Sequence, residues 1–277
     1  MTVGFMIAAP RSGSGKTTVT LGLLRAIARR NIAVASFKCG PDYIDPAFHK
    51  VATGRTSLNL DSWAMPENVL DANFTRGIAG ADCIIAEGSM GLFDGVAMRG
   101  ATGDGSSADI AARFGLPVVL VIDVSGQSQS AGAVAMGFRD FHPEVKIAGI
   151  ILGNVASERH RLLAVRGVER TGLPVFGALP RGGVPAIPER HLGLVQAEEI
   201  PNASKIVDAL ADAIETHLDV DAVLAAATPV RKPGQGAGIA LAAPGKCVAM
   251  ASDVAFSFAA MVASVPRMIF SSGQVAR

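Results

Sequence analysis

The chain has few cysteines, few aromatic residues and no excess of charge of either sign. Only three cysteines occur in 277 residues, Cys39, Cys83 and Cys247, and no two of them form a C-x-x-C pair. Such an odd, widely spaced set predicts neither a disulfide framework nor a zinc site, which is typical of a reducing cytosol. The 25 basic and 24 acidic side chains give a net charge of +1, too little to favour nucleic acid or an anionic membrane. We therefore expect a cytoplasmic protein with neither partner.

Long hydrophobic runs and an export signal are also absent. The chain is 49% apolar, too apolar for a disordered protein, yet runs such as 118–122 fall far short of the ~20 residues that span a membrane. Residues 1–10 lack the basic start of a signal peptide and lead straight into a Gly/Ser loop. Glycine, by contrast, is plentiful, with 31 residues beside 5% aromatic residues. This balance is typical of an α/β enzyme with Gly-rich loops.

Short apolar runs alternate with amphipathic stretches over the first 218 residues. Continuous apolar strands separated by helices are what a buried parallel sheet requires, so the pattern predicts a doubly wound, mostly parallel α/β fold. The expected strands are residues 3–8, 34–38, 83–87, 118–123, 147–152 and 175–179. The expected helices are residues 17–30, 66–78, 107–114, 130–138, 157–171 and 203–218.

The composition changes after residue 218. Residues 225–238 are mostly Pro, Gly and small residues, which is typical of a linker. We expect one domain over 1–222, a linker over 223–245 and the start of a second domain over 246–277. Roughly forty residues follow Gly238, too few for an independent core. The second domain is therefore expected to be truncated.

The strongest motif is a strand, a Gly/Ser loop and a helix over residues 4–18. Small residues in such a loop let backbone N–H groups surround phosphate oxygens at a helix N-terminus, Lys16 adds a charge for the β/γ-phosphates, and the Thr17 hydroxyl can ligate Mg²⁺. Pro10 replaces the first Gly of the usual pattern. The loop fits ATP or GTP, and we expect ATP. The residues expected to bind it are Ser12, Gly13, Ser14, Gly15, Lys16, Thr17 and Thr18.

Two acidic motifs follow the second and third predicted strands. Residues 38–49 read KCGPDYIDPAFH, and residues 87–95 read EGSMGLFDG. A single carboxylate in such a loop is more often solvated or caps a helix. Acids at several strand ends beside a phosphate-binding loop instead favour a site at the carboxyl edge of the sheet, and Glu87 suits a metal or a metal-bound water.

These motifs together resemble the synthetase domain of the cobyrinic acid a,c-diamide synthase family, which includes the hydrogenobyrinic acid enzymes of cobalamin biosynthesis. The matching segments are residues 12–18, 38–49, 59–61, 87–95, 157–160 and 188–194. The block Gly-Pro-Asp-Tyr-Ile-Asp-Pro is far more specific than the phosphate-binding loop. The resemblance implies a P-loop NTPase fold like that of dethiobiotin synthetase.

The resemblance also implies a reaction and its residues. The family amidates the a and c carboxylates of a corrin-type macrocycle with ATP, Mg²⁺ and glutamine or ammonia, through acyl phosphates. Carried over to this chain, the roles fall on seven residues: catalysis on Tyr43, Asp45, Glu87 and Asp94, substrate contact on Tyr43, Ile44 and His191, and the metal on Thr17, Asp45 and Glu87.

The sequence departs from the family pattern in two places. Relatives commonly carry Asn at the end of the fifth strand, suited to adenine, whereas Gly153 precedes Asn154 here. The resemblance stops near Phe258, where relatives continue into a glutaminase domain with a Cys nucleophile. Truncation or a reading-frame change would explain this ending, and we expect amidation with ammonia alone. Cys247 lies in an apolar run and is interpreted as a packing residue.

Several alternatives stay open on the sequence. A partitioning ATPase of the deviant P-loop group carries Lys early in the loop, where this chain has Arg11, and has no use for the 43–45 block. A sister ligase for another tetrapyrrole, such as nickel sirohydrochlorin, would share that block, and the truncated chain could also be inactive. His49, His160 and His191 fit either an anion contact or a surface position.

Overall fold

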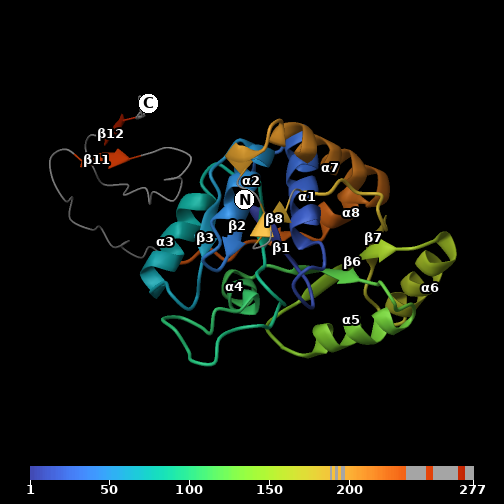
Figure 1. Cartoon of the computed structure of the whole chain (residues 1–277). Coiled ribbons are helices and arrows are strands. Elements are labelled where there is room, and N and C mark those ends of the chain that lie inside the picture. Colours follow the sequence, from blue (N-terminus) through green and yellow to red (C-terminus); the bar gives the residue numbers. More distant parts are fainter. Residues whose placement is uncertain (188, 191–192, 195–196, 235–247, 252–267, 272–277) are drawn as a thin grey trace. The chain divides into compact units, whose positions relative to one another are not determined.

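Figure 1 shows the computed structural model of the chain, which describes residues 1–187, 189–190, 193–194, 197–234, 248–251 and 268–271. By its internal contacts the chain divides into two compact units, Met1–Gly236 and Ala237–Arg277. All the residues that the motifs predict to form the site, except His191, lie in described parts of the first unit.

The first unit is built on an eight-stranded sheet. Seven strands follow the order β3-β2-β4-β1-β5-β6-β7, with every neighbouring pair parallel, and β10 adds to β1 in antiparallel register. The strands are β1 (Val3–Ala8), β2 (Val34–Cys39), β3 (Leu58–Leu60), β4 (Cys83–Glu87), β5 (Val118–Asp123), β6 (Ile147–Val155), β7 (Val175–Pro180) and β10 (Thr228–Pro229).

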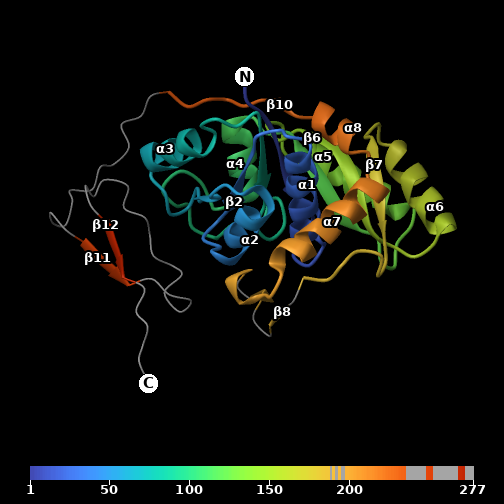
Figure 2. The ribbon, with the colours of Figure 1, turned by 90° about the horizontal axis from the view of Figure 1, so that it is seen from above.

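Helices cover both faces of this sheet (Figures 1 and 2). The helices are α1 (Lys16–Arg29), α2 (Ile44–Thr53), α3 (Glu67–Gly77), α4 (Ser107–Phe114), α5 (Ser130–Asp140), α6 (Glu158–Glu169), α7 (Ala203–His217) and α8 (Val220–Ala225). Side chains alternate along β1, so that Phe5 and Ile7 join the core under α1, α2, α7 and α8. Met6 and Ala8 join the core under α3, α4, α5 and α6. The mostly parallel, doubly wound fold predicted from the sequence is therefore confirmed.

Local sequence signals explain how the helices begin and end. The Ser106 hydroxyl accepts a hydrogen bond from the backbone N–H of Asp109 and so caps α4 at its start. Gly115 then ends α4 in the left-handed conformation, with φ of 65°. α1 begins directly after Gly15, whose φ is 89°.

The main sheet and the helices that cover it include four elements that the sequence patterns do not predict: α2, β3, α8 and β10. α2 begins inside the Pro-containing block, where Pro46 lies in the first turn and costs no helical hydrogen bond. β3 is three residues long and lies at an edge of the sheet. α8 and β10 extend the first unit into residues 223–230, which the composition had suggested as part of a linker.

The remaining described elements are short. β8 (Glu189–Arg190) and β9 (Gly193–Leu194) form an antiparallel pair, and a 3₁₀ turn spans Ala197–Glu199. In the second unit, β11 (Val248–Ala251) pairs in parallel with β12 (Met268–Ser271). Cys247 and Phe258 lie outside the described residues. No helix in the described ranges combines the length and the apolar character needed to cross a membrane.

Candidate functional site

Three loops meet at the carboxyl edge of the sheet, beside β1. The chain leaves β1 for β2 on one side and later reaches β5 on the other, so that β1 lies between β4 and β5. This reversal of strand order is where open α/β sheets bind their ligands. The loops that follow β1, β2 and β4 carry the three motifs singled out from the sequence.

The loop after β1 has the backbone of a phosphate-binding loop. Gly13 and Gly15 have φ of 74° and 89°, a conformation that favours glycine. The Ser14 hydroxyl donates a hydrogen bond to the carbonyl of Arg11 at 3.0 Å. Lys16 Nζ donates to the carbonyl oxygens of Met90, at 2.6 Å, and Arg11, at 3.3 Å. Burial lowers the pKa of Lys16 below its ordinary value. The Glu87 carboxylate raises this pKa, but the nearby Lys38 ammonium lowers it further, and the net shift is downward.

Glu87 lies at the centre of the site and is 0% exposed. Its Oε1 accepts hydrogen bonds from the Thr17 hydroxyl, at 2.6 Å, and from Lys38 Nζ, at 3.0 Å. Its Oε2 lies 2.8 Å from His49 Nε2. Burial alone would raise the pKa of Glu87, but Lys38 and the hydrogen bond from His49 hold that pKa below its usual range. The carboxylate is therefore ionised at neutral pH.

Asp45, at the start of α2, shares the same ammonium group. Its Oδ2 accepts a hydrogen bond from Lys38 Nζ at 2.5 Å and lies 3.5 Å from the Thr17 hydroxyl. Burial, together with repulsion from Glu87, raises the pKa of Asp45 to about 7 despite the opposing effect of Lys38. For Lys38, burial lowers the pKa, but Glu87 and Asp45 outweigh it and leave the pKa above its ordinary value. One permanent cation thus holds two carboxylates of different acidity.

Lys38 and His49 take part in this network although the sequence did not single them out as site residues. His49 is 0% exposed, and its Nδ1 lies 3.2 Å from the Ser57 hydroxyl, which donates to the carbonyl of Ser36. A surface position, one of the two interpretations from the sequence, is therefore wrong for His49, and the anion that it contacts is the Glu87 carboxylate. The buried positions of α2, Asp45, Phe48, His49 and Ala52, have the spacing of an amphipathic helix. That spacing was available in the sequence.

The other predicted catalytic and substrate residues lie nearer solvent. Tyr43 is 52% exposed, Ile44 is half-buried and Asp94 is exposed. One oxygen of Asp94 accepts a hydrogen bond from the backbone N–H of Gly91 at 2.8 Å. Met90, which precedes Gly91, has φ of 52°, uncommon for a residue other than glycine, and its carbonyl accepts a hydrogen bond from Lys16. His191 lies outside the described residues.

On the other side of β1, a polar group lies at the ends of β5 and β6. Arg11 pairs with Asp123 at 3.0 Å, and Asn154 also hydrogen-bonds Asp123. Burial raises the pKa of Asp123, but bonds from Ser125 and Asn154 outweigh it and lower that pKa. Asn154 is exposed with φ of 58°, whereas Gly153 before it is buried. Of the remaining histidines, His160 lies 2.7 Å from the carbonyl of Gln127 through its Nε2.

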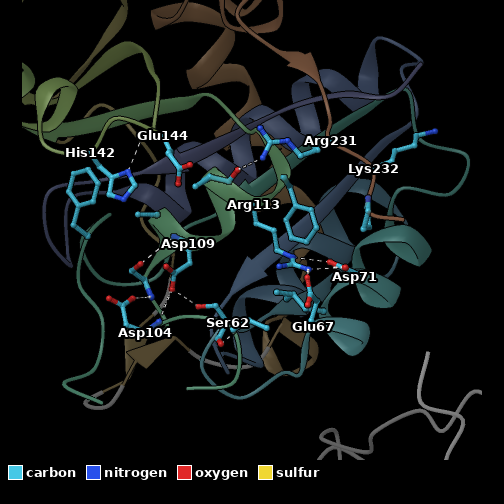
Figure 3. Close-up of a pocket in the computed structure, with 18 of the residues that line it drawn as sticks. Ser62, Glu67, Asp71, Asp104, Asp109, Arg113, His142, Glu144, Arg231 and Lys232 are labelled. Carbon is cyan, nitrogen blue, oxygen red and sulfur yellow. Dashed lines mark hydrogen bonds and ion pairs between the residues drawn. The ribbon is translucent and has the colours of Figure 1, made fainter. Parts of the chain in front are cut away.

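A cavity of about 700 Å³ lies elsewhere, over α3 and α4 (Figure 3). Several of its charged side chains bond to other side chains of the lining. Arg113 pairs with Asp71 and with Glu67, each at 2.8 Å, and Asp109 accepts from the Ser62 hydroxyl at 2.7 Å. No residue of the phosphate-binding loop lines the cavity. We therefore assign the chemistry to the loops at the sheet edge.

The donor atoms at the sheet edge fit a hard divalent cation. The carboxylates of Asp45 and Glu87 both lie within hydrogen-bonding distance of the Thr17 hydroxyl, and oxygen donors of this kind suit Mg²⁺. Among the residues that the structure describes, no group of three or more His, Cys, Asp and Glu side chains forms a metal cage. A cation here would share its coordination with other ligands, as Mg²⁺ does beside nucleotide phosphates.

Comparisons with known proteins agree with this geometry. Residues 5–195 match the model of the CobQ/CobB/MinD/ParA nucleotide binding domain. The chain is 52% identical over 254 residues to hydrogenobyrinate a,c-diamide synthase of Mesorhizobium japonicum, a match that covers 91% of this chain and 57% of that protein. It is 54% identical over 256 residues to the protein of the same name from Rhodobacter capsulatus, over 92% of this chain and 58% of that one. The chain thus spans less than two thirds of the length of these relatives.

Proposed function

Because this chain belongs to the CobQ/CobB/MinD/ParA nucleotide-binding domain family, we propose that it is an ATP-dependent ligase that amidates the a and c carboxylates of hydrogenobyrinic acid. Hydrogenobyrinate is preferred over cobyrinate because the relatives at about half identity carry that name. The observation that carries the proposal is the set of three donors on Glu87, one of which is the hydroxyl of the phosphate-binding loop.

The chemistry requires activation of a poor electrophile. A carboxylate oxygen of the macrocycle bonds to the γ-phosphorus of ATP while the bond from that phosphorus to the bridging oxygen of ADP breaks. The nitrogen of ammonia then bonds to the acyl carbon. The bond from that carbon to the phosphate oxygen breaks, phosphate leaves with the electron pair, and a proton on the nitrogen passes to solvent. The protein mainly positions the reactants and neutralises the transferring phosphoryl group. No covalent enzyme intermediate is needed.

The phosphate-binding loop supplies most of that neutralisation. Residues 12–18 turn their backbone N–H groups and the α1 N-terminus toward the phosphates, as loops of this type do. Lys16 exchanges its two backbone carbonyl partners for the β/γ-phosphate oxygens. Those carbonyls, of Arg11 and Met90, hold the ammonium group close to its working position beforehand.

Thr17, Asp45 and Glu87 hold the divalent cation in this proposal. When bound, Mg²⁺ supplies positive charge to the β- and γ-phosphate oxygens. Lys38 keeps the two carboxylates at one place, and His49 fixes the orientation of Glu87 through its second oxygen. Tyr43, Ile44, Asp94 and His191 are proposed to position the macrocycle and its reacting carboxylate.

Free ammonia is the proposed nitrogen donor for this chain. A glutaminase needs a reactive cysteine thiolate. Cys39 and Cys83 are both buried, and burial raises the pKa of each thiol to about 12. Neither can attack glutamine, and Cys247 lies outside the described residues.

The test is one assay with two nitrogen donors. The purified chain is incubated with ATP, Mg²⁺ and hydrogenobyrinic acid, with ammonium chloride or glutamine added, and the product is measured by mass spectrometry. We expect the a,c-diamide with ammonia, in a yield that rises with pH as more NH₃ is unprotonated, and neither diamide nor glutamate with glutamine. Parallel reactions with cobyrinic acid and nickel sirohydrochlorin identify the macrocycle. ATP hydrolysis that no macrocycle stimulates would instead favour a partitioning-type ATPase.

A further inference from the structure

Exposed apolar side chains gather on one half of the carboxyl edge. Nine large apolar side chains are exposed in the described part of the chain, and five of them come from the loops that follow β2, β3 and β4: Tyr43, Trp63, Met90, Val96 and Met98. These three strands are neighbours in the sheet. Exposed apolar residues scattered singly are ordinary, whereas a group at a ligand-binding edge is not.

The loop over residues 96–105 is fixed against Trp63 by backbone hydrogen bonds. The N–H groups of Thr102 and Gly103 donate to the carbonyl of Ser62 at 2.8 and 2.9 Å, and that of Ala101 donates to the carbonyl of Trp63 at 2.8 Å. A Cβ at Gly100 would lie 2.1 Å from the Trp63 carbonyl oxygen. Only glycine permits this approach, so the loop depends on Gly100 to lie this close to the Trp63 backbone.

The base of this loop is held by side chains that Figure 3 shows beside the cavity. Asp109 accepts hydrogen bonds from the Ser62 hydroxyl and from the backbone N–H of Asp104, and the Ser62 hydroxyl in turn accepts from Gly105 N–H at 3.0 Å. The polar groups at this end of the cavity therefore position the 96–105 loop. A loop fixed in this way is ordered before any ligand arrives.

The fixed loop presents apolar surface and a cation to solvent. The Trp63 indole N–H donates to the carbonyl of Met98 at 3.1 Å. Trp63 is 46% exposed and Met98 is 75% exposed. Arg99, next to Met98, is exposed, and no hydrogen bond or ion pair is found for its guanidinium among the described residues. An apolar surface beside an unpaired cation matches an apolar ring that carries carboxylates at its rim.

We propose that Trp63, Met98 and Arg99 form a docking surface for the macrocycle, with the ring against Trp63 and Met98 and a peripheral carboxylate on Arg99. The proposal rests on the function proposed above. Asp94 and Met98 are four residues apart, so their Cα atoms are at most about 14 Å apart. A macrocycle on this surface would bring a second rim carboxylate to the neighbourhood of Asp94 and the phosphate-binding loop.

The surface explains how one site reacts with two carboxylates. Ring contact with Trp63 and Met98 depends little on how the ring is rotated in its plane, because it is apolar. Arg99 can pair with any of several rim carboxylates, because the attraction between opposite charges depends on their distance and not on which carboxylate carries the charge. The macrocycle can therefore turn and present a second carboxylate after the first is amidated.

The first test separates macrocycle binding from chemistry. Met98→Gln and Arg99→Ala should each raise the KM for hydrogenobyrinic acid about five- to tenfold, with kcat and the KM for ATP within about twofold of the parent. Met136→Gln and Arg166→Ala, on α5 and α6, are the matched controls and should change neither constant. Unchanged KM values in both loop variants, with an active parent, would overturn this proposal and leave the proposed function standing.

The second test does not depend on turnover. Trp63 is the one tryptophan of the chain, so 5-fluorotryptophan gives a single ¹⁹F resonance. Hydrogenobyrinic acid should shift that resonance in the parent, and ATP alone should not. Met98→Gln should need a higher macrocycle concentration for the same shift. A resonance unmoved by the macrocycle overturns the proposal if the parent makes diamide, and overturns the proposed function as well if the parent makes none.

Discussion

Two groups of charged side chains in this molecule differ in burial rather than in residue type. At the sheet edge, Lys38 joins Asp45 and Glu87 where almost no solvent reaches them. Over α3 and α4, Arg113 joins Asp71 and Glu67 at the rim of the cavity in Figure 3, and Glu67 is largely exposed. Buried charges interact strongly and shift each other's pKa, whereas exposed pairs contribute little. The proposed site of chemistry is thus distinguished from the cavity by its buried charge.

The largest effect is expected from Lys16→Ala. This change removes the main cation for the β/γ-phosphates from a site otherwise made of backbone dipoles, and we expect loss of ATP-dependent turnover by about 10³-fold or more. Calorimetric titration with ATP and the rate of phosphate release measure it. Parent-like ATP binding and turnover in the variant would contradict the assignment of the loop.

Much of this arrangement could be predicted from the sequence. The strands and helices with clear periodicity, such as residues 83–87 and 107–114, have the bounds that the pattern indicates. The position of Glu87 at a strand end next to the phosphate-binding loop follows from the order of the elements. Its direct bond to Thr17 could not be derived, because that contact depends on β4 pairing with β1 rather than with β3.

The network behind Glu87 was missed for a physical reason. The Gly-Pro-Asp-Tyr-Ile-Asp-Pro block has the composition of a loop, but Asp42 accepts hydrogen bonds from the N–H groups of Ile44 and Asp45 and so starts a helix there. Only as a helix does the block place Asp45 and His49 on one buried face. The contact of Asn59 with this block is likewise tertiary, because the side-chain amide of Asn59 donates hydrogen bonds to the carbonyls of Gly40 and Asp42.

The next largest effect should come from the two acids. Glu87→Gln removes the charge that three donors share, and Asp45→Asn removes the weaker carboxylate, so both should raise the Mg²⁺ concentration needed for half-maximal turnover. We expect turnover to fall by about 10²-fold for Glu87→Gln and less for Asp45→Asn. Circular dichroism checks that the fold is intact. Identical Mg²⁺ titrations in parent and variants would return these acids to a structural role.

A smaller effect concerns stability against pH. Because the pKa of Asp45 is raised to about 7 in the folded protein and is near 3.9 in an unfolded chain, the folded state binds more protons between these values. The contribution of protonated Asp45 to the free energy of unfolding is therefore fully present below about pH 4 and is lost as the pH rises through 7. The side-chain amide of the Asp45→Asn variant does not titrate in this range. The difference in the free energy of unfolding between parent and Asp45→Asn, measured in urea, should shift in favour of the variant from pH 5 to pH 8, and a constant difference would contradict the raised pKa.

The smallest effect is expected at the cavity. Arg113→Ala removes a partly exposed ion pair with Asp71, the weaker pair with Glu67, and packing over the Phe114 ring. Exposed pairs of this kind are worth about 0.2–1 kcal/mol each, so we expect a loss of roughly 1 kcal/mol in the free energy of unfolding by urea. Turnover with saturating ATP and ammonia should stay within about twofold of the parent, because no atom of Arg113 bonds to the residues at the sheet edge.

The matched change at the buried cluster is Lys38→Ala, which leaves Asp45 and Glu87 facing each other without the cation that lies between them. Turnover lost in Arg113→Ala but kept in Lys38→Ala would reverse the distinction between the two groups and place the chemistry at the cavity.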